Sequence, residues 1–110
     1  MYVRIYWGRL HPGSWRAVED RYRALMLIDT PGLIARLVAR DVNDADNLFT
    51  ITIWRDIASV EAWEASPEYR DVYLAAVKKF LIGAQTVSLA EVRVENLSRW
   101  LAQNSAPDKA

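Results

Sequence analysis

An alternation of side-chain types with a period of two predicts four β-strands in this chain. They cover residues 2–9, 33–41, 48–54 and 86–95. In the first strand, Val3, Ile5 and Trp7 share one face, while Arg4 and Tyr6 lie on the other with Tyr2 and Gly8. Both faces of this strand therefore carry large side chains.

Apolar residues at three- and four-residue steps predict helices between the strands. The first helix begins after Ser14, which we expect to cap it, and ends near Asp29. The second covers residues 57–65, and a longer helix begins at Ser66-Pro67-Glu68 and ends at Gly83. Asn96 precedes a short last helix over residues 97–103.

The order of these elements is β-α-β-β-α-β, because the polar cluster at residues 43–47 joins the second and third strands as a hairpin. This order predicts an α+β, ferredoxin-like fold with a four-stranded antiparallel sheet and helices on one face. We assign residues 1–95 to this domain. Residues 96–110 form the short helix and a disordered tail, SAPDKA.

The sheet has apolar residues on both faces, but helices on one side cover only one of them. The residues concerned include Val3, Ile5, Trp7, Leu33, Leu37, Phe49, Ile51 and Ile53. A second cover is needed, and the simplest is another copy of the chain. We therefore expect a homodimer whose two sheets pack face to face.

Composition excludes several classes of function. Fourteen basic and fourteen acidic residues balance each other, so the positive charge of a nucleic-acid-binding protein is missing. No apolar run approaches the roughly 20 residues of a membrane span. The absence of cysteine is compatible with a cytoplasmic location. His11 is the single histidine, so we expect no metal site.

The aromatic content points to a pocket for a flat ligand or to a core. Five Trp, five Tyr and two Phe occur in 110 residues, and they are concentrated in residues 48–81. Strand parity and helix spacing give the candidate lining residues Arg4, Tyr6, Trp54, Trp63, Tyr69, Val72, Tyr73 and Ala76. Such a lining suits a planar, oxygenated organic molecule.

The phrase from Trp54 to Tyr69 resembles a family motif. Its pattern is W-x-D-x-x-S-V-x-A-W-x-x-S-x-x-Y, which is similar to that of the antibiotic biosynthesis monooxygenase (ABM) family. The likeness extends over roughly residues 3–94. It implies a dimeric α+β barrel with a ligand cavity between sheet and helices. Some members oxidise aromatic polyketides or quinols without a metal or an organic cofactor.

The haem-degrading members of that family give an alternative. They have two tryptophans nine residues apart, as Trp54 and Trp63 are. Where those enzymes have an Asn on the first strand and an iron-ligating His, this chain has Gly8 and Tyr73. Tyrosinate does ligate haem iron in some proteins, so the resemblance leaves haem as an alternative cofactor with Tyr73 as its ligand.

The cofactor-free chemistry implied by the resemblance requires a pocket that stabilises a substrate anion and excludes water. Arg4, Tyr73 and Trp63 are the candidate catalytic residues. Arg4 would stabilise the anion, a tyrosine would position the substrate oxygen, and Trp63 would supply a stacking wall. The alternatives are that Trp63 and Tyr73 are core residues, that Arg4 pairs with a carboxylate across the dimer, and that the protein is a non-catalytic binding or structural dimer.

Overall fold

The computed structural model describes residues 1–104. Its elements are β1 (Tyr2–Leu10), α1 (Trp15–Leu25), β2 (Leu33–Arg40), β3 (Asn47–Trp54), α2 (Ile57–Glu64), η1 (Glu68–Leu74), α3 (Ala75–Lys78), β4 (Leu81–Glu91) and α4 (Leu97–Asn104). The tail expected at residues 105–110 lies outside the described residues.

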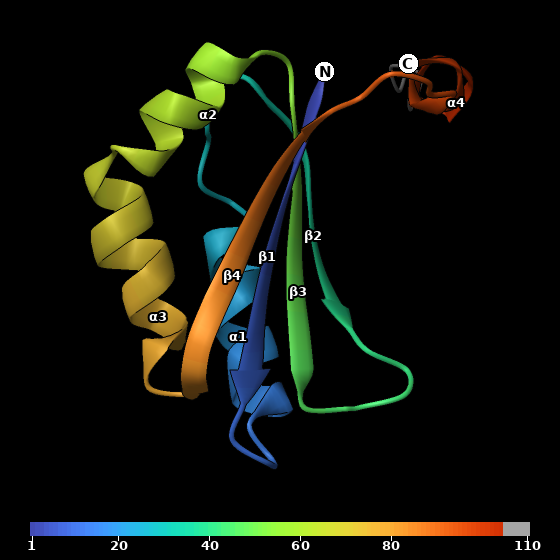
Figure 1. Cartoon of the computed structure of the whole chain (residues 1–110). Helices are drawn as coiled ribbons and strands as arrows, with labels where there is room; N and C mark the ends of the chain where they lie inside the picture. The colour runs from blue at the N-terminus through green and yellow to red at the C-terminus, as the bar shows by residue number, and fades with distance from the viewer. Residues whose placement is uncertain (105–110) are drawn as a thin grey trace, which may run out of the picture.

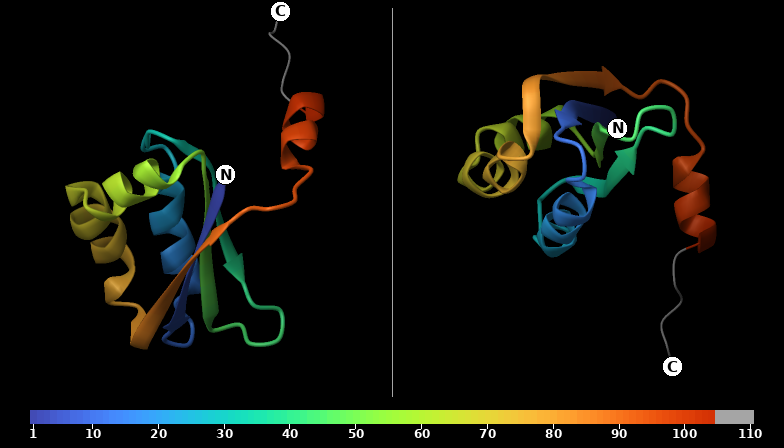
Figure 2. Two further views of the ribbon diagram at one scale, coloured as in Figure 1. Left: turned by 45° about the horizontal axis from the view of Figure 1, so that its top comes forward. Right: turned by 90° about the horizontal axis from the view of Figure 1, so that it is seen from below.

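The four strands form one antiparallel sheet in the order β2-β3-β1-β4 (Figure 1). Helices α1, α2 and α3, with η1, lie on one side of it, and α4 lies on the opposite side (Figure 2). The ferredoxin-like α+β fold predicted from the sequence is therefore confirmed. The last helix is the exception to the expectation that helices cover one face.

The two faces of the sheet differ in chemistry. On β1, Arg4, Tyr6 and Leu10 point under the helices and are buried. Val3, Ile5 and Trp7 point to the open face and are half-buried. Each is paired across the sheet with an apolar residue of β3, namely Ile53, Ile51 and Phe49. The open face is thus an apolar surface, while the helix-covered face carries polar groups.

The fourth strand begins earlier than the sequence pattern predicts. It runs from Leu81 to Glu91 instead of residues 86–95, and the preceding helix ends at Lys78, before Gly83. The register against β1 shifts between Trp7 and Arg9, where Gly83 adopts a φ of 71°. A glycine within a strand often marks such a bulge, and it interrupts the alternation on which the prediction relied.

Helix α1 differs from expectation at both of its ends. Helix α1 ends at Leu25, not near Asp29, and the Ser14 side chain makes no capping hydrogen bond.

The start of helix α2 is capped by Asp56, whose Oδ1 accepts a 2.8 Å hydrogen bond from the backbone N–H of Ser59. An acidic side chain at this position satisfies a free backbone donor of the first turn.

The segment η1 is a π-helix, which the α-helical spacing did not predict. Its backbone hydrogen bonds link residues i and i+5, so one face repeats every four or five residues. Tyr69, Tyr73 and Leu74 therefore share the face turned toward the sheet. Val72, at i+3 from Tyr69, is turned away and is 38% exposed.

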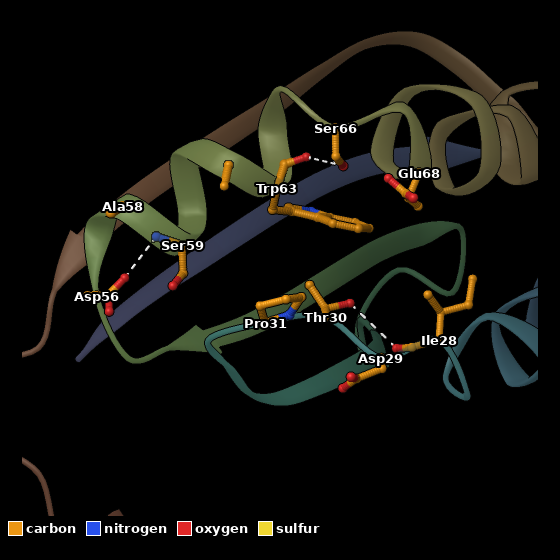
Figure 3. A pocket seen from close by; sticks show the side chains of 11 residues that line it. Ile28, Asp29, Thr30, Pro31, Asp56, Ala58, Ser59, Trp63, Ser66 and Glu68 are labelled. Atoms are coloured by element: carbon orange, nitrogen blue, oxygen red, sulfur yellow. Dashed lines mark hydrogen bonds between the residues drawn. The ribbon is translucent and has the colours of Figure 1, made fainter.

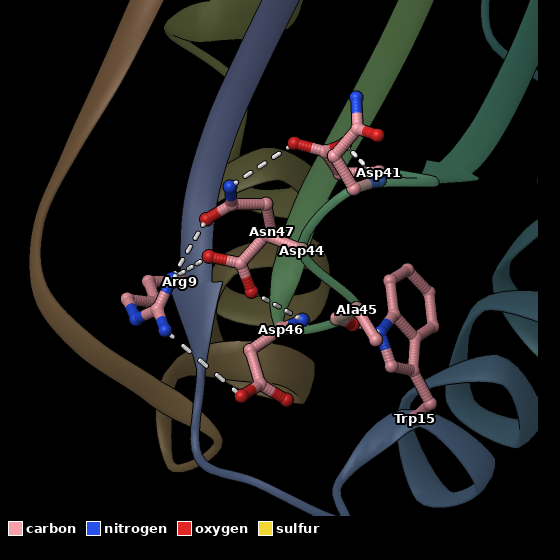
Figure 4. A network of polar contacts seen from close by, with 8 residues as sticks. Arg9, Trp15, Asp41, Asp44, Ala45, Asp46 and Asn47 are labelled. Carbon is pink, nitrogen blue, oxygen red and sulfur yellow. Dashed lines mark hydrogen bonds and ion pairs between the residues drawn. The ribbon is translucent and has the colours of Figure 1, made fainter.

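The hairpin between β2 and β3 is attached to the first strand (Figure 4). Arg9 Nη1 donates to Asp44 Oδ2 at 2.7 Å and to Asn47 Oδ1 at 3.2 Å. The Trp15 indole N–H donates to the carbonyl of Ala45. These contacts hold the loop at the end of the sheet that is far from α2.

In the residues described, no helix is long and apolar enough to cross a membrane.

Gly32 is the position where the fold depends most directly on a missing side chain. It has a φ of 81°, and a Cβ there would overlap the Ser59 side chain at the start of α2. Gly13 has a φ of 80° with open space around it.

We predict that Gly32→Ala lowers the free energy of unfolding by about 3 kcal/mol, whereas Gly13→Ala lowers it by about 1 kcal/mol from the backbone alone. Urea denaturation measures both, and equal losses would contradict the steric account.

Candidate functional site

Trp63 lines two cavities: an outer one beside α2 and an inner one between the helices and the sheet. The outer cavity has a volume of about 490 Å³, which is within the usual range for small-molecule sites. The inner cavity is about 30 Å³, comparable with the volume of one water molecule. Trp63 itself is only 7% exposed.

The outer cavity lies between α2 and the loop that joins α1 to β2 (Figure 3). The indole of Trp63 and the ring of Pro31 lie on opposite sides of it. Ser66 marks its inner end, where its Oγ donates to the Trp63 carbonyl at 2.6 Å and accepts from the Tyr69 N–H at 3.2 Å. This pair of hydrogen bonds connects the end of α2 to the start of η1 and fixes the turn that follows Trp63.

The inner cavity is built on a polar row across the sheet. Arg36 of β2 pairs with Thr52 of β3, which pairs with Arg4 of β1. All three side chains line the inner cavity. Residues of the next row and of the helices complete the lining: Tyr6, Tyr22, Thr50, Trp63, Tyr69, Tyr73 and Leu74. Two guanidinium groups and four phenol groups therefore meet in one small space.

Arg4 is held by an acidic partner within the same chain. Its Nε donates to Glu64 Oε2 at 2.8 Å, and its Nη2 donates to the Tyr69 hydroxyl at 2.8 Å. The guanidinium also lies 4.9 Å from the centre of the Tyr69 ring. Its side chain is 5% exposed and that of Glu64 is 41% exposed. The alternative that Arg4 pairs with a carboxylate across a dimer is therefore not needed to compensate its charge, because Glu64 of α2 is its partner.

Arg36 is held by aromatic groups. Its Nη1 donates to the Tyr73 hydroxyl at 2.7 Å, and its Cζ lies 4.4 Å from the Tyr73 ring centre and 5.1 Å from that of Trp63. The Tyr73 hydroxyl in turn donates to the carbonyl of Leu25 at 2.6 Å. Both hydrogen-bonding functions of Tyr73 are therefore used to position Arg36 against α1.

Two buried polar atoms of the inner cavity make no hydrogen bond with the residues described. They are the hydroxyl of Tyr6 and Nη2 of Arg36. Buried polar groups without partners are rare in folded proteins, so each calls for an explanation. Burial raises the pKa of Tyr6 well above the ordinary value of a phenol, and burial lowers the pKa of Arg36.

Five of the eight residues selected from the sequence line the inner cavity: Arg4, Tyr6, Trp63, Tyr69 and Tyr73. Trp54 is fully buried behind them, with its indole N–H donating to Thr52 Oγ1 at 2.7 Å. Val72 and Ala76 line a separate groove between α1 and α3. The structure does not bring these last three side chains to the cavities around Trp63.

Arg36 and Tyr22 were not selected from the sequence. Tyr22 comes from α1, and its hydroxyl is 3.1 Å from Thr50 Oγ1. The signal for Arg36 was present, because a 33–41 strand paired with the 48–54 strand places it in the Arg4 row. Finding it requires the register of β2 against β3 and of β3 against β1, in addition to the alternation within β2.

Haem does not fit the Tyr73 oxygen in this arrangement. The oxygen already accepts from Arg36 and donates to Leu25, and Tyr73 is 5% exposed. The inner cavity around it is far smaller than a porphyrin. Within residues 1–104, no cluster of three or more His, Asp or Glu side chains is suited to hold a metal ion.

Comparison with known proteins places this geometry in a family. The family model for antibiotic biosynthesis monooxygenases matches residues 1–73. The chain belongs to that family. The ABM resemblance of the Trp54–Tyr69 phrase is therefore confirmed, and no curated protein sequence matches the chain.

Solved structures share the ABM fold. A crystal structure of an antibiotic biosynthesis monooxygenase has a TM-score of 0.70 and 20% identity, covering 86% of this chain and 100% of that one. Rv0793 from Mycobacterium tuberculosis has a TM-score of 0.70 and 17% identity, covering 86% and 96%. SnoaB, a cofactor-independent oxygenase from Streptomyces nogalater solved as a point mutant, has a TM-score of 0.68 and 14% identity, covering 86% and 94%.

The buried tyrosines predict how this ABM protein responds to alkali. Burial is the main cause that raises the pKa of Tyr6, Tyr22 and Tyr73 above 10. An unfolded chain ionises these groups near pH 10 and then binds fewer protons than the folded chain. The stability that they contribute is therefore complete below pH 10 and is lost as the pH rises further. In an alkaline titration, we predict that tyrosinate absorbance and loss of circular dichroism increase together. Ionisation of these three tyrosines near pH 10 while the protein stays folded would contradict this prediction.

Proposed function

We propose that the protein is a monooxygenase that acts without a metal or organic cofactor on a planar, oxygenated aromatic molecule. One observation carries the proposal: a cavity with a tryptophan wall lies beside the buried guanidinium of Arg4 and the half-buried guanidinium of Arg36, which has no carboxylate partner among the described residues. Membership of the ABM family and the likeness to the oxygenase SnoaB support it.

The reaction proposed converts an activated ring CH₂ group to a carbonyl. The substrate gives one proton to solvent at the open outer cavity, the resulting carbanion adds dioxygen at carbon, and a proton from solvent then gives a hydroperoxide. Loss of water with the second hydrogen leaves the carbonyl. The substrate supplies four electrons, one oxygen atom enters the product and the other leaves as water, so dioxygen is the only co-reactant.

Each side chain has a role set by its contacts. Trp63 forms the flat wall against which the ring stacks. Arg36 and Arg4 supply the positive field for the carbanion in a site with little water, where such charges act strongly. Tyr69 and Tyr73 act by holding the two guanidinium groups in place. Tyr6 is the hydroxyl that is free to donate to a substrate oxygen.

A non-catalytic binding protein is the second candidate, and one observation favours it. The residues that line the inner cavity include no His, Asp or Glu side chain, and its buried tyrosines resist ionisation. A protein that binds without turnover would show stabilisation by its ligand and no oxygen consumption.

We also propose a homodimer formed through the open sheet face, acting in the cytoplasm. The half-buried pairs Val3–Ile53, Ile5–Ile51 and Trp7–Phe49 lie on this face, and Leu37 beside them is 49% exposed. A contiguous apolar surface of this kind is typical of an interface. The absence of cysteine is in keeping with a reducing compartment.

Oxygen uptake tests the enzymatic proposal. With 1,8-dihydroxyanthrone as the probe, we expect uptake well above that of buffer, with one dioxygen consumed for each quinone formed. Trp63→Leu should lower the rate by at least about tenfold, since a loss of about 1.4 kcal/mol of transition-state binding gives that factor. Trp100→Leu, on the exposed surface of α4, is the matched control and should keep the rate. Uptake equal to that of buffer, or unaffected by Trp63→Leu, would exclude this assignment.

Sedimentation tests the dimer. We expect a particle of twice the 12.6 kDa chain mass at micromolar concentration. Ile51→Lys should give monomers, because it buries an unpaired charge in the interface. Val42→Lys, in a loop where the side chain is 96% exposed, should leave the dimer intact. A wild-type monomer would refute the proposed interface.

A further inference from the structure

The charges around the inner cavity do not balance. Arg4 and Arg36 both line it, and Glu64 forms an ion pair with Arg4. Among residues 1–104, no carboxylate lies within ion-pair distance of Arg36. Its guanidinium is held by the hydroxyl of Tyr73 and by two aromatic rings. Arg36 is half-buried, and its Nη2 is shielded from solvent without a partner. A shielded cation without a counter-ion is costly, so this site lacks one negative charge.

The unpaired donors identify where that charge belongs. Arg36 makes its hydrogen bond through Nη1, which leaves Nη2 buried without a partner, and Tyr6 OH lines the same cavity in the same condition. Tyr6 is 5% exposed. Both atoms can donate to an oxygen atom of a ligand that enters this cavity. The cavity of about 30 Å³ has room for one such atom.

No group in the cavity is suited to create the charge by removing a proton. The lining residues that titrate are arginines and tyrosines. Burial raises the pKa of Tyr6, Tyr22 and Tyr73, so these phenols stay protonated at neutral pH. Tyr73 also directs its proton to the Leu25 carbonyl. Glu64 already accepts from Arg4.

We propose that the inner cavity receives the oxygen of a ligand that is already an anion, and that Arg36 is the residue that selects it. The ligand class is a planar aromatic with an ionised oxygen, such as a hydroxyquinone or the enol of a 1,3-dicarbonyl. Its ring lies against Trp63 in the outer cavity, and its oxygen accepts from Arg36 Nη2 and Tyr6 OH. The inference rests on the proposed function in placing the ligand at this site, and it adds the charge that the ligand carries.

A matched pair of probes tests the selection by charge. 2-Hydroxy-1,4-naphthoquinone is an anion at neutral pH, whereas 2-methoxy-1,4-naphthoquinone has the same ring system and no charge. Titration calorimetry with the full chain measures both affinities. We expect the anion to bind at least about tenfold more tightly, as a charge-assisted hydrogen bond contributes about 1.5 kcal/mol or more.

Three variants locate the preference. Arg36→Gln should lower the affinity for the anion at least about tenfold and reduce the ratio of the two affinities to about one. Tyr6→Phe should lower the affinity for the anion severalfold without loss of stability, because the hydroxyl it removes has no partner in the described protein; this variant keeps the test valid if Arg36→Gln does not fold. Arg40→Gln, further along β2 and exposed, is the control and should retain the preference.

The outcomes separate this inference from the enzymatic proposal. Preferential binding of the anion without oxygen uptake would refute the oxygenase and leave the charge selection standing. Equal affinities, no binding of the hydroxy compound at millimolar concentration, or a preference that survives both Arg36→Gln and Tyr6→Phe would overturn the inference. So would a complex in which only a water molecule lies between Arg36 Nη2 and Tyr6 OH.

Discussion

The placement of two guanidinium groups beneath the helices, that of Arg4 buried and that of Arg36 half-buried, is the constraint on which the rest of the site depends. Each must be compensated where water is scarce. Arg4 is compensated by Glu64 and Tyr69, which ties β1 to α2 and η1. Arg36 is compensated only in part, through Tyr73 and the rings above it. The wider turn of the π-helix η1 directs Tyr69 and Tyr73 toward the sheet. Their hydroxyl groups then hold the two arginines of the polar row on the sheet.

The distribution of polarity across the sheet is the basis for proposing two functional surfaces. A sheet that served stability alone would place its apolar residues under the helices. Here the Arg36–Thr52–Arg4 row lies under the helices, and the apolar pairs of β1 and β3 face outward. The covered side is therefore the proposed site for the ionised oxygen of an aromatic ligand, and the open side is the proposed dimer interface. The fold separates the two surfaces by the thickness of one sheet.

The sequence predicted what short-range periodicity determines. Alternation in β1 placed Arg4 and Tyr6 on one face, and the Trp54–Trp63 spacing placed a strand next to a helix. It did not reveal Arg36, because that requires the pairing of β2 with β3 and of β3 with β1. It grouped Val72 with Tyr69 because a π-helix has no distinct hydrophobic signature. It placed β4 too late because the bulge at Gly83 breaks the period.

The most direct test of the account is a crystal structure of the protein with 2-hydroxy-1,4-naphthoquinone. We predict that the naphthoquinone ring lies against Trp63 and that its ionised oxygen is within hydrogen-bond distance of Arg36 Nη2 and Tyr6 OH. A ligand bound elsewhere, or Arg36 paired with a carboxylate of the protein or of a second copy, would contradict the claim that this half-buried cation is the receptor for an anionic ligand.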